Sequence, residues 1–262
     1  MLTKDQQLTV AEAIYKAEVE RELCLPPSKM YPEADVTDSY RIAQIVTELK
    51  IAAGRKVRGK KIGLTSKAMQ KLVKVDEPDY GNLFDNWFLD SSSALKRDDL
   101  NHPTVEIELA FVLKKDLSGP DVNAADVIQA TDFIMPAFEI VDSRYKERGN
   151  SIIVDSVADA ASCGGIILGG KPISLKGIDL SRQGAALLKN GIIEQTGTAA
   201  AVMGNPINSV SWLARKLHQF GDGLNAGDTI LSGSFVQMIP FDRGDTITAN
   251  FGELGVLSFG VV

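Results

Sequence analysis

Residues 104–113 read TVEIELAFVL, and residues 133–141 read FIMPAFEIV. Both stretches are rich in β-branched and aromatic residues, a composition typical of strands that lie in the core of a sheet. The segment between them contains a turn, SGPD, and a short helical pattern, NAADVIQA. The two stretches therefore predict two core strands of a β-rich body.

The first of these strands carries two acids on one face. Side chains alternate along a strand, so Glu106 and Glu108 point the same way, roughly 7 Å apart at the backbone. Their face continues with Ala110 and Val112, which indicates that it is covered. Two like charges out of water cost several kcal/mol unless a cation joins them. The alternative is a half-buried strand whose glutamates are solvated.

A third acid favours the cation. Glu139 lies in the second strand, where its neighbours for several residues are apolar. A carboxylate in such a run needs a cation, a hydrogen-bonded partner or protonation. Three carboxylates on two core strands, with no His or Cys nearby in the pattern, suit a hard divalent cation such as Mg²⁺ or Mn²⁺. The sequence therefore predicts a metal site formed by these three glutamates.

Two further residues are candidates for chemistry. Lys61, in VRGKKIGLTS, is flanked on its face of a predicted strand by Gly59 and Gly63, which leave space for a ligand. Taken alone, a solvated lysine is the simpler interpretation. Asp79, in EPDYG, lies in a loop where an Asp is most often a turn former.

Several familiar motifs are excluded. Residues 54–61 read GRKVRGKK, which looks like a phosphate-binding loop, but Lys61 stands where Ser or Thr must hold magnesium. The chain contains no Gly-rich dinucleotide fingerprint, nucleophile elbow or zinc-protease motif. The two histidines, His102 and His218, have no setting that suggests a catalytic triad. Chemistry must rely on carboxylates, lysine and hydroxyls, or on a metal with oxygen ligands.

The composition excludes other classes of partner. The 262 residues include 28 Lys and Arg against 34 Asp and Glu, giving a net charge of −6 without a basic stripe. Nucleic acid is therefore excluded as a partner. No run of 18 apolar residues predicts a membrane span, and no signal peptide is visible. Two cysteines, Cys24 and Cys163, are consistent with a reducing compartment, so we expect a cytoplasmic protein.

Periodicity along the chain predicts the organisation. Helices are expected over residues 3–24 and 37–53, the second with Thr37 or Asp38 as N-cap and Gly54 after its end. From Val57 onward, short strands alternate with turns, including a hairpin at Asn190-Gly191. A helix is expected over 151–162, with Asp155 and Asp159 on a solvated face, and another over 208–220. We expect a helical segment, 1–55, packed on one α+β body, 56–262.

Several blocks of the sequence resemble one known family. KKIGLTSKAMQ, EPDYGNLF, VEIELAFVL, FIMPAFEIVDSR, VDSVADAASCG and the closing GDTI strands are similar to the 2-oxopent-4-enoate (2-hydroxypenta-2,4-dienoate) hydratases of the fumarylacetoacetate hydrolase superfamily. The similarity runs from about residue 35 to the C-terminus. It implies a mixed β-sheet roll or sandwich wrapped by helices, in homo-oligomers. It also implies a metal-dependent hydratase that adds water to a 2-hydroxy-2,4-dienoate, giving a 4-hydroxy-2-oxo acid in aromatic meta-cleavage catabolism.

The same resemblance implies roles for individual residues. Metal-binding carboxylates match Glu106, Glu108 and Glu139, and the positions that look catalytic match Lys61 and Asp79. Substrate-side hydroxyls match Thr65, Ser162 and Ser234. The hydratases usually read Asp-Asn-Ala-Ser, whereas here Asp159 is followed by Ala160, so a polar amide is missing.

Three alternatives stay open. The sister 4-oxalocrotonate decarboxylases share the metal site, but their Lys-Met-Gly-Leu-Thr-Ser and Ala-Ser-Ser blocks differ from KIGLTS and ASCG here. A C–C bond hydrolase would need a His-Glu pair in the N-terminal part, where His102 is the sole histidine of that half. A non-catalytic subunit would not need Lys61 and Asp79. A complex with the sister enzyme is a further expectation, and the substrate's chain length is left open between a five-carbon acid and a seven-carbon dioate.

Overall fold

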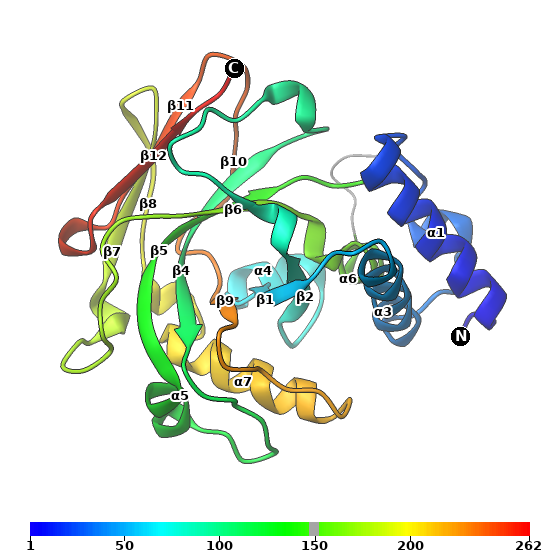
Figure 1. Ribbon diagram of the computed structural model, residues 1–262, viewed down its shortest axis with the longest axis horizontal. Coiled ribbons are helices and arrows are strands. Elements are labelled where there is room, and N and C mark those ends of the chain that lie inside the picture. The colour runs from blue at the N-terminus through cyan, green and yellow to red at the C-terminus, as the bar shows by residue number, and fades with distance from the viewer. Residues whose placement is uncertain (147–151) are drawn as a thin grey trace.

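Two long antiparallel strands, β4 and β5, form the centre of the molecule (Figure 1). The computed structural model describes residues 1–146 and 152–262. Its helices are α1 (Lys4–Glu20), α2 (Pro27–Met30), α3 (Val36–Ala52), α4 (Lys67–Val73), α5 (Ala124–Ala130), α6 (Ile153–Ala158) and α7 (Pro206–His218). Its strands are β1 (Val57–Gly63), β2 (Asp79–Phe84), β3 (Phe88–Leu89), β4 (Thr104–Leu113), β5 (Thr131–Val141), β6 (Cys163–Leu168), β7 (Gly184–Lys189), β8 (Ile192–Thr198), β9 (Thr229–Leu231), β10 (Ile239–Pro240), β11 (Thr246–Asn250) and β12 (Val256–Gly260).

The larger sheet is mixed. Its strands follow the order β2-β1-β9-β4-β5-β6-β3, and β10 pairs with β4 beside this path. The pairs β1–β9 and β3–β6 are parallel, and the other pairs are antiparallel. The predicted strands at 104–113 and 133–141 are confirmed as the central pair, which carries the acidic residues.

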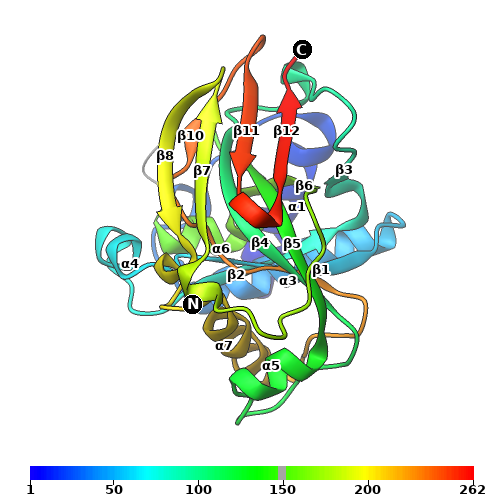
Figure 2. The same ribbon diagram turned by 90° about the vertical axis from the view of Figure 1, so that its left-hand side faces the viewer.

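The smaller sheet is antiparallel, of order β12-β11-β7-β8, and consists of two hairpins paired through β7 and β11 (Figure 2). Its β7–β8 hairpin turns at Asn190 and Gly191, whose φ angles of 53° and 79° match the left-handed turn that this dipeptide favours. Aromatic side chains join the two sheets: Phe138 of β5 packs edge-to-face on Phe259 of β12, with ring centroids 5.1 Å apart. The predicted sandwich of an α+β fold is confirmed.

The N-terminal helices lie on the opposite side of the molecule from the smaller sheet (Figure 1). Helices α1 and α3 share a buried apolar cluster that includes Ile14, Ile42 and Tyr145. Helix α3 begins at Val36, and its N-cap is Asp35 rather than the predicted Thr37 or Asp38, because the side chain of Asp35 accepts the backbone N–H of Asp38 in a capping box. Among the described residues, no helix has both the length and the apolarity needed to cross a membrane.

The helix expected over 151–162 is shorter than predicted. Helix α6 ends at Ala158, and a left-handed turn at Ala160–Ser162 leads into β6. Residue 151 lies outside the described residues. The prediction of a solvated face is wrong, since Asp155 and Asp159 are each only 2% exposed. Both carboxylates have polar partners from elsewhere in the chain, half-buried Ser28 for Asp155 and buried Arg144 for Asp159, that the local sequence pattern does not reveal.

Candidate metal and catalytic site

Three carboxylates converge on the face shared by β4 and β5. Glu106 and Glu139 are direct register partners, and Glu108 lies two residues further along β4 on the same face. One oxygen from each of the three lies within 4.8 Å of the others. Glu108 and Glu139 are buried, and Glu106 is half-buried. The predicted clustering of these glutamates is therefore present in the structure.

The oxygens of this cluster fit a hard cation. Glu108 Oε2 accepts the backbone N–H of Gly233 at 2.7 Å. Glu108 Oε1 and Glu139 Oε2 accept no hydrogen bond from any described residue. Buried polar atoms are normally satisfied, and a divalent cation bound by carboxylates at about 2.0–2.6 Å would satisfy these. The donor set is all oxygen, as Mg²⁺ and Mn²⁺ prefer.

The raised pKa values of the cluster also indicate that its carboxylates lack enough neighbouring positive charge. Burial, followed by the charge of Glu139, raises the pKa of Glu106 to about 7. Burial and the charges of Glu139 and Glu106 raise the pKa of Glu108 well above its usual value. Each carboxylate thus makes ionisation of the others more costly, and a cation between them would reverse this effect.

Lys61 supplies one positive charge beside the carboxylates. Its Nζ lies 3.0 Å from Glu139 Oε1 and donates a hydrogen bond to the carbonyl oxygen of Ala161 at 3.2 Å. Burial alone would lower the pKa of Lys61, but the charges of Glu139 and Asp79 outweigh it and raise that pKa above its usual value. The ammonium is therefore charged and is held by an ion pair with Glu139 and a hydrogen bond to Ala161.

Asp79 lies at the start of β2, on the strand next to Lys61. It is 1% exposed, and its Oδ2 accepts a hydrogen bond from Ser156 Oγ at 3.1 Å. Its Oδ1 has no hydrogen-bond partner among the described residues. Burial raises the pKa of Asp79, although the charge of Lys61 opposes this. Asp79 thus combines a positioned carboxylate with a free oxygen.

Gly63 brings Asp79 and Lys61 together. It is the register partner of Asp79 across β1 and β2. A Cβ on Gly63 would overlap Asp79 Oδ1 and would lie 3.5 Å from Lys61 Nζ. Asp79 Oδ1 and Lys61 Nζ therefore both border the space that glycine leaves, as the flanking glycines in the sequence predict.

The three residues with predicted substrate-side hydroxyls belong to segments that contact this site. Thr65 is buried against Gly233, the residue that donates to Glu108. Ser234 follows Gly233, and its hydroxyl donates to the carbonyl of Val236 at 2.8 Å. Ser162 ends the left-handed turn, and its hydroxyl donates to Asp159 Oδ2 at 3.0 Å. Their roles in binding substrate stay predictions.

Comparison with known proteins places the chain in a family. Residues 57–262 match the family described as fumarylacetoacetate (FAA) hydrolase C-terminal. The chain belongs to the fumarylacetoacetate hydrolase family. One member of the wider group, the 2-oxo-hept-4-ene-1,7-dioate hydratase of Escherichia coli, is 41% identical over 98% of both chains. The 2-keto-4-pentenoate hydratase of Paraburkholderia xenovorans is 39% identical, covering 97% of this chain and 94% of its own.

Comparison with a solved structure shows that the similarity covers the whole fold of this chain. The 4-oxalocrotonate decarboxylase from Pseudomonas putida G7, complexed with magnesium and adipate, superimposes with a TM-score of 0.96. Its sequence is 35% identical, and the match covers 100% of this chain and 99% of that one. The predicted membership of the hydratase and decarboxylase group of the superfamily is confirmed.

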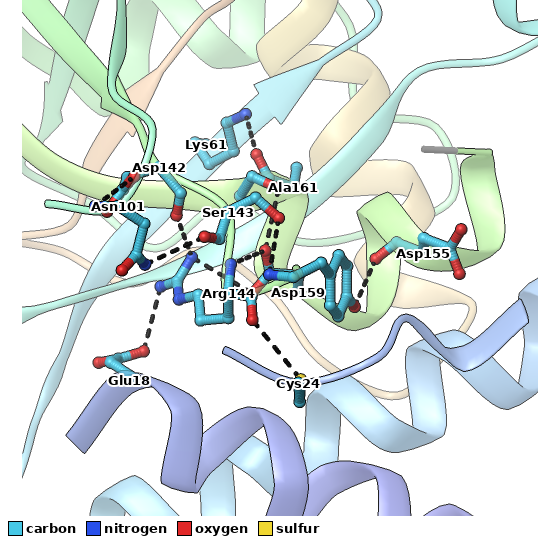
Figure 3. A network of polar contacts seen from close by, with 12 residues as sticks. Glu18, Cys24, Lys61, Asn101, Asp142, Ser143, Arg144, Asp155, Asp159 and Ala161 are labelled. Atoms are coloured by element: carbon cyan, nitrogen blue, oxygen red, sulfur yellow. Dashed lines mark hydrogen bonds and ion pairs between the residues drawn. The ribbon is translucent and has the colours of Figure 1, made fainter. Parts of the chain in front are cut away.

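Several residues around the site of this chain were not predicted from the sequence. Ser156 and Gly233 each donate a hydrogen bond to a carboxylate of the candidate site. Arg144 and Asp159 form a buried ion pair, with 3.3 Å between Arg144 Nη1 and Asp159 Oδ1 (Figure 3). The one signal available was the spacing of acids in VDSVADAAS, which by periodicity alone predicts a solvated helix face.

Proposed function

We propose that the protein is a metal-dependent hydratase that adds water to a 2-hydroxy-2,4-dienoate, giving a 4-hydroxy-2-oxo acid. The observation that carries this proposal is the meeting of three clustered carboxylates, two of them buried, with Lys61 and Asp79 at one site. Two relatives with 41% and 39% identity are named as hydratases of 2-oxo-4-enoates. Their substrates suit a site that holds a cation next to proton-transfer groups.

Glu106, Glu108 and Glu139 would hold the divalent cation. A bound Mg²⁺ or Mn²⁺ supplies Lewis-acid stabilisation of negative charge on the 2-oxygen of a 2-oxo acid. The substrate loses its enol proton and gains a proton on carbon, which leaves an alkene conjugated to the 2-carbonyl. Water then adds its hydroxide to the far alkene carbon and a proton to the near one.

Lys61 and Asp79 move protons in these steps. Lys61 Nζ is fixed by Glu139 and Ala161, and Asp79 Oδ1 is free to accept from water or substrate. Proton transfer by positioned side chains contributes roughly 10²–10⁴ in rate. We propose that Thr65, Ser162 and Ser234 bind the substrate beside these groups.

A spectrophotometric assay tests the proposal. The purified protein is given 2-hydroxypenta-2,4-dienoate, 2-hydroxyhepta-2,4-diene-1,7-dioate or 4-oxalocrotonate, with and without Mg²⁺, while dienol absorbance and CO₂ are followed. We expect metal-dependent loss of a dienol without release of CO₂. Absence of turnover on all three compounds would refute the enzyme assignment, and the rates on the first two compounds give the preferred chain length.

A second candidate function is decarboxylation of 4-oxalocrotonate. The observation that favours it is the TM-score of 0.96 to a decarboxylase over the whole chain. The same metal site and proton-transfer groups serve loss of CO₂ from a 2-oxo acid as well as addition of water. Stoichiometric CO₂ from 4-oxalocrotonate, without hydration of the other two dienols, would establish this candidate.

We further propose that the chain divides into a helical segment, 1–55, and a catalytic body, 56–262, and that it acts as a cytoplasmic homo-oligomer. The family match begins at residue 57, close to the proposed boundary. Both cysteines are free thiols, which suits a reducing compartment. Light scattering would test assembly, alone and mixed with the sister decarboxylase, and cell fractionation would test location.

A further inference from the structure

A left-handed turn lies against the candidate site. Ala160, Ala161 and Ser162 have φ angles of 50°, 51° and 57° in succession. This conformation is disfavoured for residues that carry a Cβ, and three in a row without glycine must be held by their surroundings. Hydrogen bonds close the turn at both ends: Ser162 N–H donates to the carbonyl of Asp159, and Asp142 N–H donates to the carbonyl of Ser162, each at 2.8 Å.

The side chain of Asp159 also holds the turn. Its Oδ2 accepts from Ser162 Oγ at 3.0 Å and from the backbone N–H of Arg144 at 3.3 Å. Its Oδ1 lies 3.3 Å from Nη1 of Arg144. Both partners are almost fully buried. A buried pair of this kind fixes geometry because moving either partner leaves an uncompensated charge.

Arg144 is itself fixed from the N-terminal helices. Its Nη2 lies 3.1 Å from Glu18 Oε2 on α1 (Figure 3). Its guanidinium lies 5.0 Å from the ring centroid of Trp87. The order of contacts therefore runs from α1, through Arg144 and Asp159, to the turn.

The left-handed turn, Ala160–Ser162, contacts Lys61 directly. The carbonyl oxygen of Ala161 accepts from Lys61 Nζ at 3.2 Å and, together with the ion pair to Glu139, holds the ammonium in place. The turn has no space to move toward β2, since a Cβ on Gly81 would lie 2.5 Å from the carbonyl oxygen of Ala160. A change in the turn therefore displaces the acceptor of Lys61.

We propose that Arg144 and Asp159 are positioning residues, whose buried ion pair holds the left-handed turn Ala160–Ser162 so that the Ala161 carbonyl orients the Lys61 ammonium. The kinetic part of this inference rests on the proposed function. An ammonium displaced by about 1 Å from its reacting partner can cost a hundredfold in rate, even when the displacing change lies far from the chemistry.

The test compares Arg144→Lys and Arg144→Met with the same variants carrying Ala160→Gly. Glycine adopts positive φ without steric cost, so it replaces the support that the ion pair gives. We expect the single variants to show at least tenfold faster amide hydrogen exchange at Ser162 and kcat lowered about ten- to hundredfold. The KM for substrate and the affinity for Mn²⁺ should stay within about twofold. Added glycine should restore most of both losses.

The control is Arg243→Met, which removes an exposed arginine from its ion pair with Asp98 and should change neither readout. Wild-type exchange and turnover in both arginine variants would overturn the proposal. Losses that glycine leaves unrepaired would overturn it too. If neither arginine variant folds, Ser162→Ala carries the test by exchange alone, and unchanged exchange across the turn then refutes the role of Asp159.

The exchange measurement needs no substrate, so the two hypotheses fail separately. Faster exchange that glycine reverses, in a protein that consumes none of the dienols, would refute the proposed function and leave the positioning role. Turnover by the wild type with unchanged exchange in the arginine variants would refute the positioning role alone.

Discussion

Glu106 and Glu139 are direct partners across the antiparallel pair β4–β5, so two carboxylates face each other in the interior of a sheet. Like charges at opposed positions destabilise a sheet. Glu108 adds a third acid on the same face, and Lys61 provides one compensating charge, 3.0 Å from Glu139. The three carboxylates repel one another, and a bound divalent cation would reduce that repulsion.

Metal removal should therefore lower thermal stability. A cation at a hundred times its Kd adds about 2.7 kcal/mol to the free energy of unfolding, which corresponds to several degrees in Tm for a chain of this size. We expect EDTA to lower Tm by that amount and Mn²⁺ to restore it. Glu106→Gln should lose the response to Mn²⁺, whereas Glu194→Gln, an exposed residue of β8, should keep it. The same Tm with and without Mn²⁺ would contradict the metal site.

Lys61→Met should abolish turnover and keep metal binding. The lysine charge lies beside a ligand of the proposed cation, so its removal takes away a repulsive neighbour. We expect kcat to fall about 10²–10⁴-fold while calorimetry shows Mn²⁺ affinity unchanged or tighter. Lys176→Met, which removes an exposed lysine, serves as the control. Turnover within a few fold of the wild type would show that Lys61 takes no part in the chemistry.

Gly63→Ala should damage catalysis more than stability. The added Cβ overlaps a side-chain atom, Asp79 Oδ1, and no backbone atom, so the carboxylate must shift from its present position. We expect kcat to fall at least tenfold, with the urea midpoint nearly unchanged. Gly260→Ala is the matched control, because a Cβ there meets no atom within 4 Å. Equal kcat values for the two variants would mean that the position of Asp79 does not limit the reaction.

The acidic cluster was predictable because strand periodicity is local. Alternation along 104–113 puts Glu106 and Glu108 on one face, and an acid inside an apolar run, Glu139, needs a partner wherever the strand lies. Register is not local: nothing in either segment specifies that Glu106 opposes Glu139. Only the folded pairing supplies that contact.

The buried network beyond the cluster could not be predicted for a related reason. Asp159 follows Asp155 by four residues, which on an isolated helix describes one polar face. The partners that bury them, Ser28 for Asp155 and Arg144 for Asp159, come from other parts of the chain. Helix α6 also ends earlier than its polar pattern, because three left-handed residues follow it. Tertiary contacts decide both features.

Glu18, the partner of Arg144, also pairs with a buried lysine of α3, Lys50. Lys50 Nζ lies 2.6 Å from Glu18 Oε2 and over the rings of Phe84 and Trp87, at 4.2 Å and 4.0 Å from their centroids. Burial lowers the pKa of Lys50 to about 8, with the charge of Arg144 acting in the same direction and that of Glu18 opposing it. The titration of Lys50, on α3, therefore makes the stability of the folded protein depend on pH.

Stability should rise with pH on account of Lys50. Between pH 8 and the usual lysine pKa of about 10.5, the unfolded chain keeps the Lys50 proton while the folded chain has lost it. The unfolded state then binds more protons, so the free energy of unfolding increases with pH in this window. Relative to Lys50→Met, the wild type should gain up to about 3 kcal/mol between pH 8 and 10.5 in urea titrations. Lys176→Met should run parallel to the wild type, and a parallel curve for Lys50→Met would mean that Lys50 titrates alike in both states.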